Sequence, residues 1–306
     1  MMRRSLRAVK LEEVKSETPS EVKSEVPRTV AKPAPRRAKR EHPADSVVRE
    51  SKALRVDDND AGPYPQHARP SQEECYAAHL GLSALHPEVI ERVRARLANT
   101  ADDEAGCGSR KEVLDALVGT ILSQNTTDVN SHRAFSNLKA AFPTWDQVRT
   151  SPPAPIIEAI RSGGLAEIKT GRIQAILETV HAERGECSLE HLRSEPDSVV
   201  KATLRRFKGV GAKTISCVLL FCLHRADFPV DTHVWKIALS LGWVPKSADR
   251  DGTYEHLNRR VPDAIKYDLH VLLVEHGKQY KNQTTVLRKL ISGETAITES
   301  KPACVD

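Results

Sequence analysis

The stretch of sequence that decides the fold is Leu204-Arg-Arg-Phe-Lys-Gly-Val-Gly-Ala-Lys-Thr214. It predicts a helix that ends near Phe207, a tight turn at Gly209-Val210-Gly211, and a second helix from Ala212. Glycine adopts backbone angles that are closed to other residues and lets amides approach a ligand. A helix N-terminus adds N–H groups and a partial positive charge. The segment therefore predicts a phosphate-binding hairpin, with the valine between the glycines packed into the interior.

Outside this hairpin the chain has a helical pattern. Apolar residues recur at helical spacing from Val113 to Ile121. The motifs Ser71-x-x-Glu74 and Ser109-x-x-Glu112 each fit a capping box at a helix start. Cys217–Leu223 is strand-like, but it fits better as the buried interior of a helix. The fold class is therefore predicted to be all-α. Further helices are expected at about 87–98, 127–141, 153–161, 168–184, 197–206, 213–224, 232–241, 262–276 and 282–291.

Composition limits the class of protein. The chain has 306 residues, with 46 Lys and Arg against 41 Asp and Glu, so its net charge is +5. That charge is too small to identify a nucleic-acid partner by itself. The sequence contains no run of ~18 apolar residues, so we expect no membrane span. Its six cysteines form no Cys-x-x-Cys pair, which predicts reduced thiols in an intracellular protein.

The N-terminal segment is predicted to be a disordered basic tail over residues 1–69. It has few large apolar residues, so it cannot bury enough surface to offset the entropy of ordering. Between Val26 and Arg40 there are six basic residues and no acid. This run predicts a nuclear address or a nucleic-acid-binding arm, with a merely solvated tail as the alternative. We expect a nuclear protein. The start Met1–Arg7 leaves an organelle open, although glutamates follow it closely.

Three further motifs accompany the hairpin in order: Leu122-Ser-Gln-Asn-Thr-Thr-Asp128, Gly163-Gly-Leu165 and Pro229-Val-Asp-Thr-His233. With them the chain resembles the helix-hairpin-helix (HhH-GPD) DNA glycosylases of the endonuclease III type, and among these the plant endonuclease III-like proteins. The resemblance covers about residues 70–278. It implies a two-lobed helical fold with a DNA-binding cleft.

The resemblance also implies domain limits and an activity. Residues 107–225 would form a six-helix domain, 70–106 plus 226–292 a second helical lobe, and 293–306 a disordered tail. The protein would be a monomer that excises a damaged base, an oxidised pyrimidine by expectation, from double-stranded DNA. It would also act as an AP lyase, cleaving the strand at the abasic site.

The resemblance assigns two catalytic residues. Lys213 would be the nucleophile, because an amine can attack the sugar C1′ and form a Schiff base. The positive end of a helix disfavours the protonated form of a lysine in its first turn. Asp231 would stabilise positive charge on the sugar or accept a proton. The alternatives are an exposed lysine that neutralises a phosphate, and an aspartate that caps the helix beginning near Thr232.

The same resemblance places DNA contacts on two loops and the hairpin. Enzymes that act on a base extrude it from the duplex, and protein side chains fill the hole. Gln124 or Asn125 would occupy the gap, beside Thr126, and Leu165 would wedge into the opposite strand. The alternatives are an ordinary polar loop and a core leucine. The hairpin contacts are expected from Gly209, Val210, Gly211 and Thr214.

Many members of the family carry an iron–sulfur cluster held by four cysteines near the C-terminus. Here Gln279, Tyr280 and Lys281 follow the end of the motif region, and only Cys304 lies beyond them. One cysteine cannot supply four ligands. We therefore expect no cluster and no metal, and a splice variant or gene-model error could account for the divergent C-terminus.

Two alternative functions follow from these features. A catalytically weak DNA-binding protein could keep the hairpin as a phosphate clamp, and the missing cluster favours that interpretation. A clamp needs neither Lys213 nor Asp231, which favours the enzyme. A glycosylase acting on 5-methylcytosine would share the catalytic motifs, but the short chain favours repair.

Overall fold

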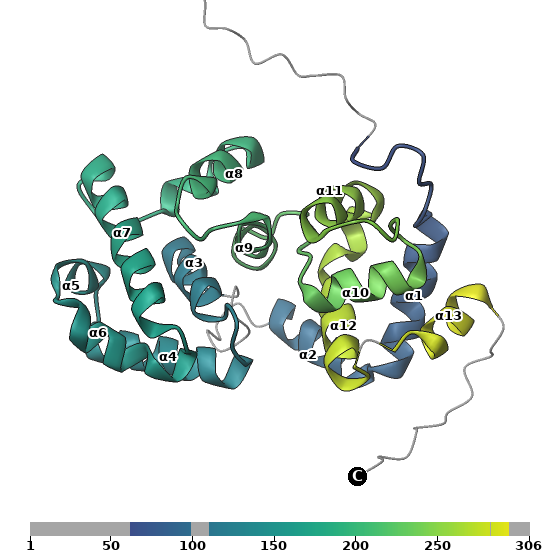
Figure 1. Ribbon diagram of the computed structural model, residues 1–306, viewed down its shortest axis with the longest axis horizontal. Helices are drawn as coiled ribbons and strands as arrows, with labels where there is room; N and C mark the ends of the chain where they lie inside the picture. Colours follow the sequence, from purple (N-terminus) through teal and green to yellow (C-terminus); the bar gives the residue numbers. More distant parts are fainter. Residues whose placement is uncertain (1–61, 99–109, 282, 294–306) are drawn as a thin grey trace, which may run out of the picture. The chain divides into compact units, whose positions relative to one another are not determined.

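The computed structural model describes residues 62–98, 110–281 and 283–293, and this part of the chain folds into helices and loops without a strand (Figure 1). The all-α fold class predicted from the sequence is confirmed. In the same residues no helix has the length and apolar character needed to span a membrane. The basic segment at 26–40 and the end of the chain after residue 293 lie outside the described residues.

The first lobe has a core of buried side chains drawn from residues 113–222. At its centre is α3 (Val113–Leu122), in which every residue except Asp115 is buried. Around it lie α4 (Asp128–Ala141), α5 (Trp145–Thr150), α6 (Pro153–Ile160), η1 (Arg161–Gly163), α7 (Ala166–Arg184), η2 (Glu190–Arg193), α8 (Asp197–Arg205), α9 (Ala212–Cys217) and the π-helix η3 (Val218–Cys222).

The second lobe has a separate core built from both sides of the first lobe in sequence. Its central helix α12 (Lys266–Gln279) packs on α1, α2 and α10. The other elements of this lobe are α1 (Gln72–Leu85), α2 (Pro87–Ala98), α10 (Thr232–Leu241), α11 (Arg250–Arg260), η4 (Asp263–Ile265) and α13 (Thr285–Ser292). The two cores fall within the predicted lobes; the exact domain limits stay a prediction.

Residues 62–69, predicted to belong to the disordered tail, pack on the second lobe. The ring of His67 bonds to the carbonyl of Gly242 at 3.0 Å. The ring of His256 bonds to the carbonyl of Arg69 at 2.7 Å. These backbone contacts compensate for the low apolar content of the segment, so the predicted start of order near Pro70 is too late.

Local signals set most helix starts. The capping box at Ser71 and Glu74 is present, with both reciprocal hydrogen bonds. Ser109 of the second predicted capping box lies outside the described residues, and α3 begins at Val113. The amide of Val113 instead donates to the carboxylate of Glu190 at 2.5 Å, so a distant side chain replaces the local cap. The run after Cys217 is helical, as predicted, and continues as the π-helix.

Candidate active site

The hairpin between α8 and α9 has the predicted turn. Val210 is buried in the core of the first lobe, as expected. Gly209 has a φ of +85°, and a Cβ there would lie 2.7 Å from side-chain atoms of Arg172. Gly211 has a φ of −102° and open space around it, so its backbone does not require glycine. The expectation that both glycines are needed for their backbone angles holds only for Gly209.

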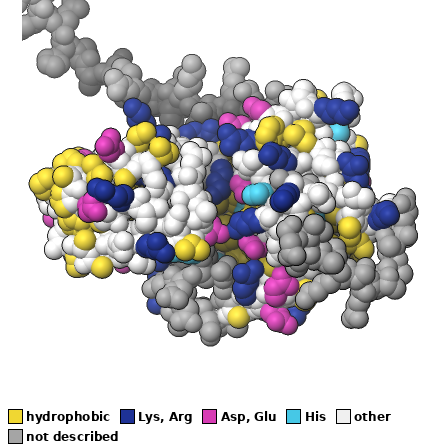
Figure 2. Space-filling view, turned by 60° about the horizontal axis from the view of Figure 1, so that its bottom comes forward, with side chains coloured by type: hydrophobic (Ala, Val, Ile, Leu, Met, Phe, Trp, Pro, Cys, Tyr) yellow, Lys and Arg dark blue, Asp and Glu magenta, His cyan; other side chains and the backbone are white. Residues whose placement is uncertain are grey.

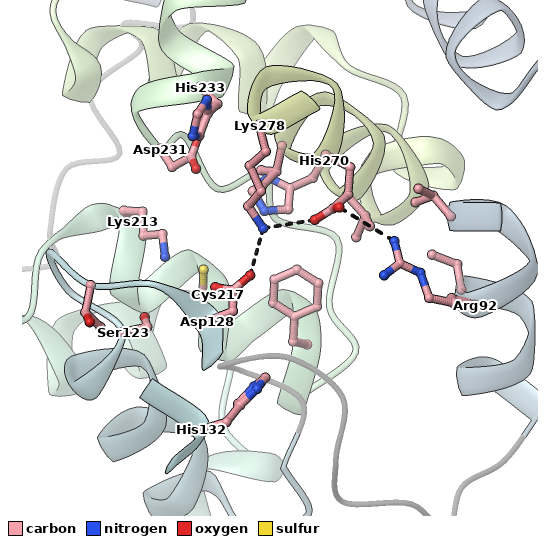
Figure 3. A pocket seen from close by; sticks show the side chains of 17 residues that line it. Arg92, Ser123, Asp128, His132, Lys213, Cys217, Asp231, His233, His270 and Lys278 are labelled. Carbon is pink, nitrogen blue, oxygen red and sulfur yellow. Dashed lines mark hydrogen bonds and ion pairs between the residues drawn. The ribbon is translucent and has the colours of Figure 1, made fainter. Parts of the chain in front are cut away.

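Lys213 and Asp231 line one cavity of about 430 Å³. Lys213 is the second residue of α9, and Asp231 lies directly before α10. Figure 3 shows both side chains pointing into the cavity, with Cys217 one turn below Lys213 on α9. The structure thus brings together, from two lobes, the two residues that the sequence analysis expected to be catalytic. Figure 2 shows Lys and Arg side chains along the middle of one face, with Asp, Glu and His among them.

Asp231 is also the N-cap of α10. Its Oδ1 accepts a hydrogen bond from the amide of Val234 at 2.8 Å. The cap fixes the carboxylate at the cavity wall, because the side chain is tied to the first turn of a helix whose core face is buried. The capping role that the sequence offered as an alternative is therefore real, and it orients the carboxylate as well as stabilising the helix.

His270 on α12 supports the segment that carries Asp231. Its Nδ1 lies 2.9 Å from the carbonyl of Pro229. A carbonyl only accepts hydrogen bonds, so Nδ1 carries the proton and donates it. Burial lowers the pKa of His270 to about 4, and the charges of Asp231 and Lys213 act on it as well. The imidazole is therefore neutral near pH 7 and holds the Pro-Val-Asp segment in place.

A chain of ion pairs lines the cavity and joins the two lobes. Nζ of Lys278 on α12 lies 2.7 Å from Oδ2 of Asp128 on α4 and 2.9 Å from Oε1 of Glu275. Glu275 also pairs with Arg92 on α2 at 3.6 Å. Burial alone would raise the pKa of Asp128, but the hydrogen bond and charge of Lys278 outweigh it and lower that pKa. Figure 3 shows this chain beside the cavity.

Sequence reasoning missed this network. Asp128 does not cap its helix, because the cap of α4 is Thr127, whose side chain accepts from the amide of Asn130. Asp128 is the first residue of α4, and its carboxylate instead pairs with Lys278 of the second lobe. Lys278 directly follows His276 and Gly277, at the end of the family motif region, which is the one sequence signal that pointed to its neighbourhood.

The loop after α3 is joined to the hairpin by Gln124. Its Nε2 donates to the carbonyl of Gly209 at 3.1 Å and to Oγ1 of Thr214 at 3.3 Å. Its Oε1 accepts from the guanidinium of Arg172 at 3.1 Å. Three bonds hold this amide inside the protein. Which of Gln124 and Asn125 fills a gap in DNA stays a prediction.

Asn125 is exposed and has a φ of +55°. Thr126, next to it, lines the cavity that contains Lys213. Leu165 is 52% exposed, with a φ of +50°, in the turn that precedes α7. An exposed leucine in a left-handed turn is not a core residue, which removes that alternative for Leu165. The DNA-binding roles of these residues stay predictions.

The described residues after α12 lack the cysteines that a C-terminal four-thiolate cluster would need. After α12, Tyr280 stacks on His276, with ring centroids 4.8 Å apart, and α13 packs on α1. The described residues from Gln279 to Gly293 contain no cysteine. Cys75 is buried in the core of the second lobe. Cys107 and Cys304 lie outside the described residues, so the absence of a cluster stays a prediction.

Comparisons with known proteins agree with the motifs. The family model described as "HhH-GPD superfamily base excision DNA repair protein" matches residues 118–263. The "Putative DNA glycosylase At3g47830" of Arabidopsis thaliana is 48% identical over 235 residues, which are 72% of this chain and 80% of that protein. "Endonuclease III" of Sulfolobus acidocaldarius is 32% identical over 176 residues, 56% of this chain and 76% of that protein.

A solved structure shares the fold. The "Trapped Endonuclease III-DNA Covalent Intermediate" has a TM-score of 0.53 and 19% identity to this chain. The match covers 69% of this chain and 87% of that chain. Helices of both lobes are therefore needed to account for the likeness, since neither core spans that share of the chain alone.

Proposed function

Because the chain belongs to the HhH-GPD superfamily of base excision DNA repair proteins and is a DNA glycosylase, we propose that it is also an AP lyase that works through Lys213. The observation that carries the proposal is the single cavity lined by Lys213 and Asp231. A protein that only clamps phosphates needs neither an amine nor a carboxylate in such a cavity. The substrate is a damaged base, an oxidised pyrimidine, in double-stranded DNA.

The reaction follows from the chemistry of the two groups. The lone pair of the Lys213 amine forms a bond to the sugar C1′ as the bond between C1′ and the base breaks. The base leaves with the electron pair of the broken C1′–N bond and takes up a proton. The nitrogen then loses a proton, the C1′–O4′ bond breaks as the C=N bond forms, and O4′ takes up a proton, so that a Schiff base to the opened sugar results. Loss of a C2′ proton breaks the C3′–O bond, so the 3′ phosphate leaves and the strand is cut.

Asp231 acts while charge develops. Positive charge builds on the sugar as the base departs, and a fixed carboxylate stabilises it. The same carboxylate accepts a proton from Lys213. Its N-cap bond to Val234 and the support of the segment by His270 keep it in place at no reorganisation cost. The neutral imidazole adds no competing positive charge to the cavity near pH 7.

The surrounding loops would bind the duplex. Asn125 fills the gap that the extruded nucleotide leaves, and Leu165 wedges into the opposite strand. The hairpin amides of Gly209 to Gly211 and the hydroxyl of Thr214 contact phosphates. We propose that the protein acts as a monomer in the nucleus, where the basic segment at 26–40 would direct it.

Borohydride trapping tests the proposal. The protein is incubated with a duplex containing thymine glycol, and a covalent adduct is expected only while Lys213 is present. Lys213→Gln should abolish the adduct. Lys236→Gln, at an exposed lysine of α10 outside the cavity, is the matched control and should leave it unchanged. A panel of 5-hydroxycytosine, 8-oxoguanine, uracil and 5-methylcytosine duplexes identifies the base.

Two outcomes would contradict the proposal. Duplex binding without an adduct on any lesion would favour the catalytically weak DNA-binding protein. Base release without an adduct or strand cleavage would mean that a water molecule is the nucleophile, and that Lys213 serves another purpose. Preferential release of 5-methylcytosine would leave the Schiff-base chemistry in place and replace the substrate class.

A further inference from the structure

Lys169 is a buried lysine that the catalytic cavity does not use. It lies in the first turns of α7, is 1% exposed, and is among the largest fully buried side chains. Its Nζ donates to the carbonyl of Leu122 at 2.7 Å and to the carbonyl of Gly163 at 2.8 Å. Burial lowers the pKa of this amine to about 8, with a further contribution from the charge of Arg172. Burying an ammonium is costly unless its donors are satisfied.

The two carbonyls that accept from Lys169 each belong to the last residue of a helix. Leu122 is the last residue of α3, and Gly163 is the last residue of the short helix η1. Carbonyls at helix ends lack partners within the helix, and here one ammonium bonds to both. The two elements approach closely at this point, because a Cβ on Gly163 would lie 3.7 Å from the carbonyl oxygen of Leu122. The lysine therefore joins two chain segments that are 41 residues apart, counting from Leu122 to Gly163.

Each carbonyl immediately precedes a loop expected to contact DNA. Three residues after Leu122 is Asn125, and two residues after Gly163 is Leu165. Both Asn125 and Leu165 have positive φ, at 55° and 50°. Such backbone conformations are strained and persist only when the surrounding structure holds them. The bonds from Lys169 anchor both loops at their starting points.

We propose that Lys169 is a positioning residue that holds the Asn125 loop and the Leu165 turn at a fixed spacing for insertion into DNA. The inference rests on the proposed function, because it takes these loops as the ones that enter the duplex. Lys169 lies outside the residues that line the cavity, so it acts only through the loops. Its loss should impair insertion and leave the chemistry at Lys213 intact.

The test separates insertion from chemistry. A duplex with a tetrahydrofuran abasic analogue opposite 2-aminopurine reports insertion, because the fluorescence of the orphaned base changes when side chains enter the gap. Lys169→Met should lose most of this change and should excise thymine glycol from duplex DNA ~100-fold more slowly, as expected for a small misplacement. Borohydride trapping on a single-stranded abasic site, which requires no insertion, should equal that of the wild type.

Three controls accompany this variant. Lys139→Met removes a lysine of α4 that pairs with Asp115, away from both loops, and should behave as the wild type. Lys169→Arg keeps the charge and donors and should recover part of the fluorescence change. If Lys169→Met lacks the circular dichroism of the wild type, Lys169→Gln, which keeps one donor group, takes its place.

Two results would overturn the role of Lys169. One is a folded Lys169→Met protein with wild-type insertion signal and excision. The other is single-stranded trapping that falls in step with duplex excision, since that indicates general damage to the fold. Failure of the proposed function would give a different result, because the wild type would then show the fluorescence change but release no base. The fluorescence change of the Lys169 variants would still test the role of Lys169.

Discussion

Replacing Asp231 with asparagine separates its two roles. The Oδ1 of Asp231 accepts the amide of Val234 at 2.8 Å, and an asparagine oxygen can accept the same bond. Asparagine and aspartate are equally good N-caps, so the free energy of unfolding should change by less than about 0.5 kcal/mol. Alanine cannot make the bond, and Asp231→Ala should cost about 1 kcal/mol. Both variants remove the negative charge at the cavity.

The loss of excision rate in these two variants should not parallel their loss of stability. Loss of a placed acid or base slows a reaction ~10²–10⁴-fold, so Asp231→Asn and Asp231→Ala should both be slow, by similar factors. Single-turnover excision from a thymine-glycol duplex measures the rate, and urea unfolding measures the stability. The useful comparison is that Asp231→Asn should be as stable as the wild type and as slow as Asp231→Ala.

Two results would refute this reasoning. An Asp231→Asn protein with nearly wild-type excision would mean that the carboxylate only caps α10. An Asp231→Asn protein as unstable as Asp231→Ala would mean that the amide does not keep the cap. The slow rate could then arise from displacement of the helix, and the charge would not be the cause.

Three further predictions concern other parts of the structure. Gly209→Ala should destabilise the protein by about 1–2 kcal/mol, because the turn needs a positive φ, and should weaken duplex binding in a titration. Asp227→Ala should lower the free energy of unfolding in urea by about 3–5 kcal/mol, because the buried carboxylate that pairs with the Lys201 amine is lost and the amine keeps no counter-charge there. Lys278→Met should destabilise by less than about 1 kcal/mol near pH 7, because this ion pair with Asp128 is largely exposed. That difference should shrink as the pH falls below about 4, since the lowered pKa of Asp128 makes its contribution disappear on protonation.

Periodicity predicted most helices of the fold, because an apolar stripe is a local property. It missed α5 and α11, and α11 shows why. Its sequence, Arg250–Arg260, contains a glycine and few apolar residues, so it has almost no stripe. Its N-cap, Asp249, was the available signal. The helix is stabilised by packing of Tyr254 and Leu257 on a core built from distant segments, which a local pattern does not contain.

The sequence predicted the site residues that lie within short motifs, and it did not predict contacts between residues far apart in the chain. Lys213 and Asp231 belong to short motifs, and both lie at the cavity. The bond from Lys278 to Asp128 joins residues 150 positions apart, and no motif contains both. From the sequence alone, Gln124 and Asn125 were equally good candidates for the residue that fills the gap in DNA. The three bonds of Gln124 to the hairpin and Arg172 appear only in the structure, and they are the reason for proposing Asn125.

The discontinuous second lobe has a consequence for synthesis on the ribosome. Helices α1 and α2 pack on α12, and α1 also packs on α13, whose residues emerge roughly 200 positions later. At ~5–20 residues per second, the early helices wait roughly 10–40 s for their partners. The first lobe is contiguous in sequence and can complete its core in that interval. The buried faces of α1 and α2 are then the surfaces on which a chaperone would act while the nascent chain grows.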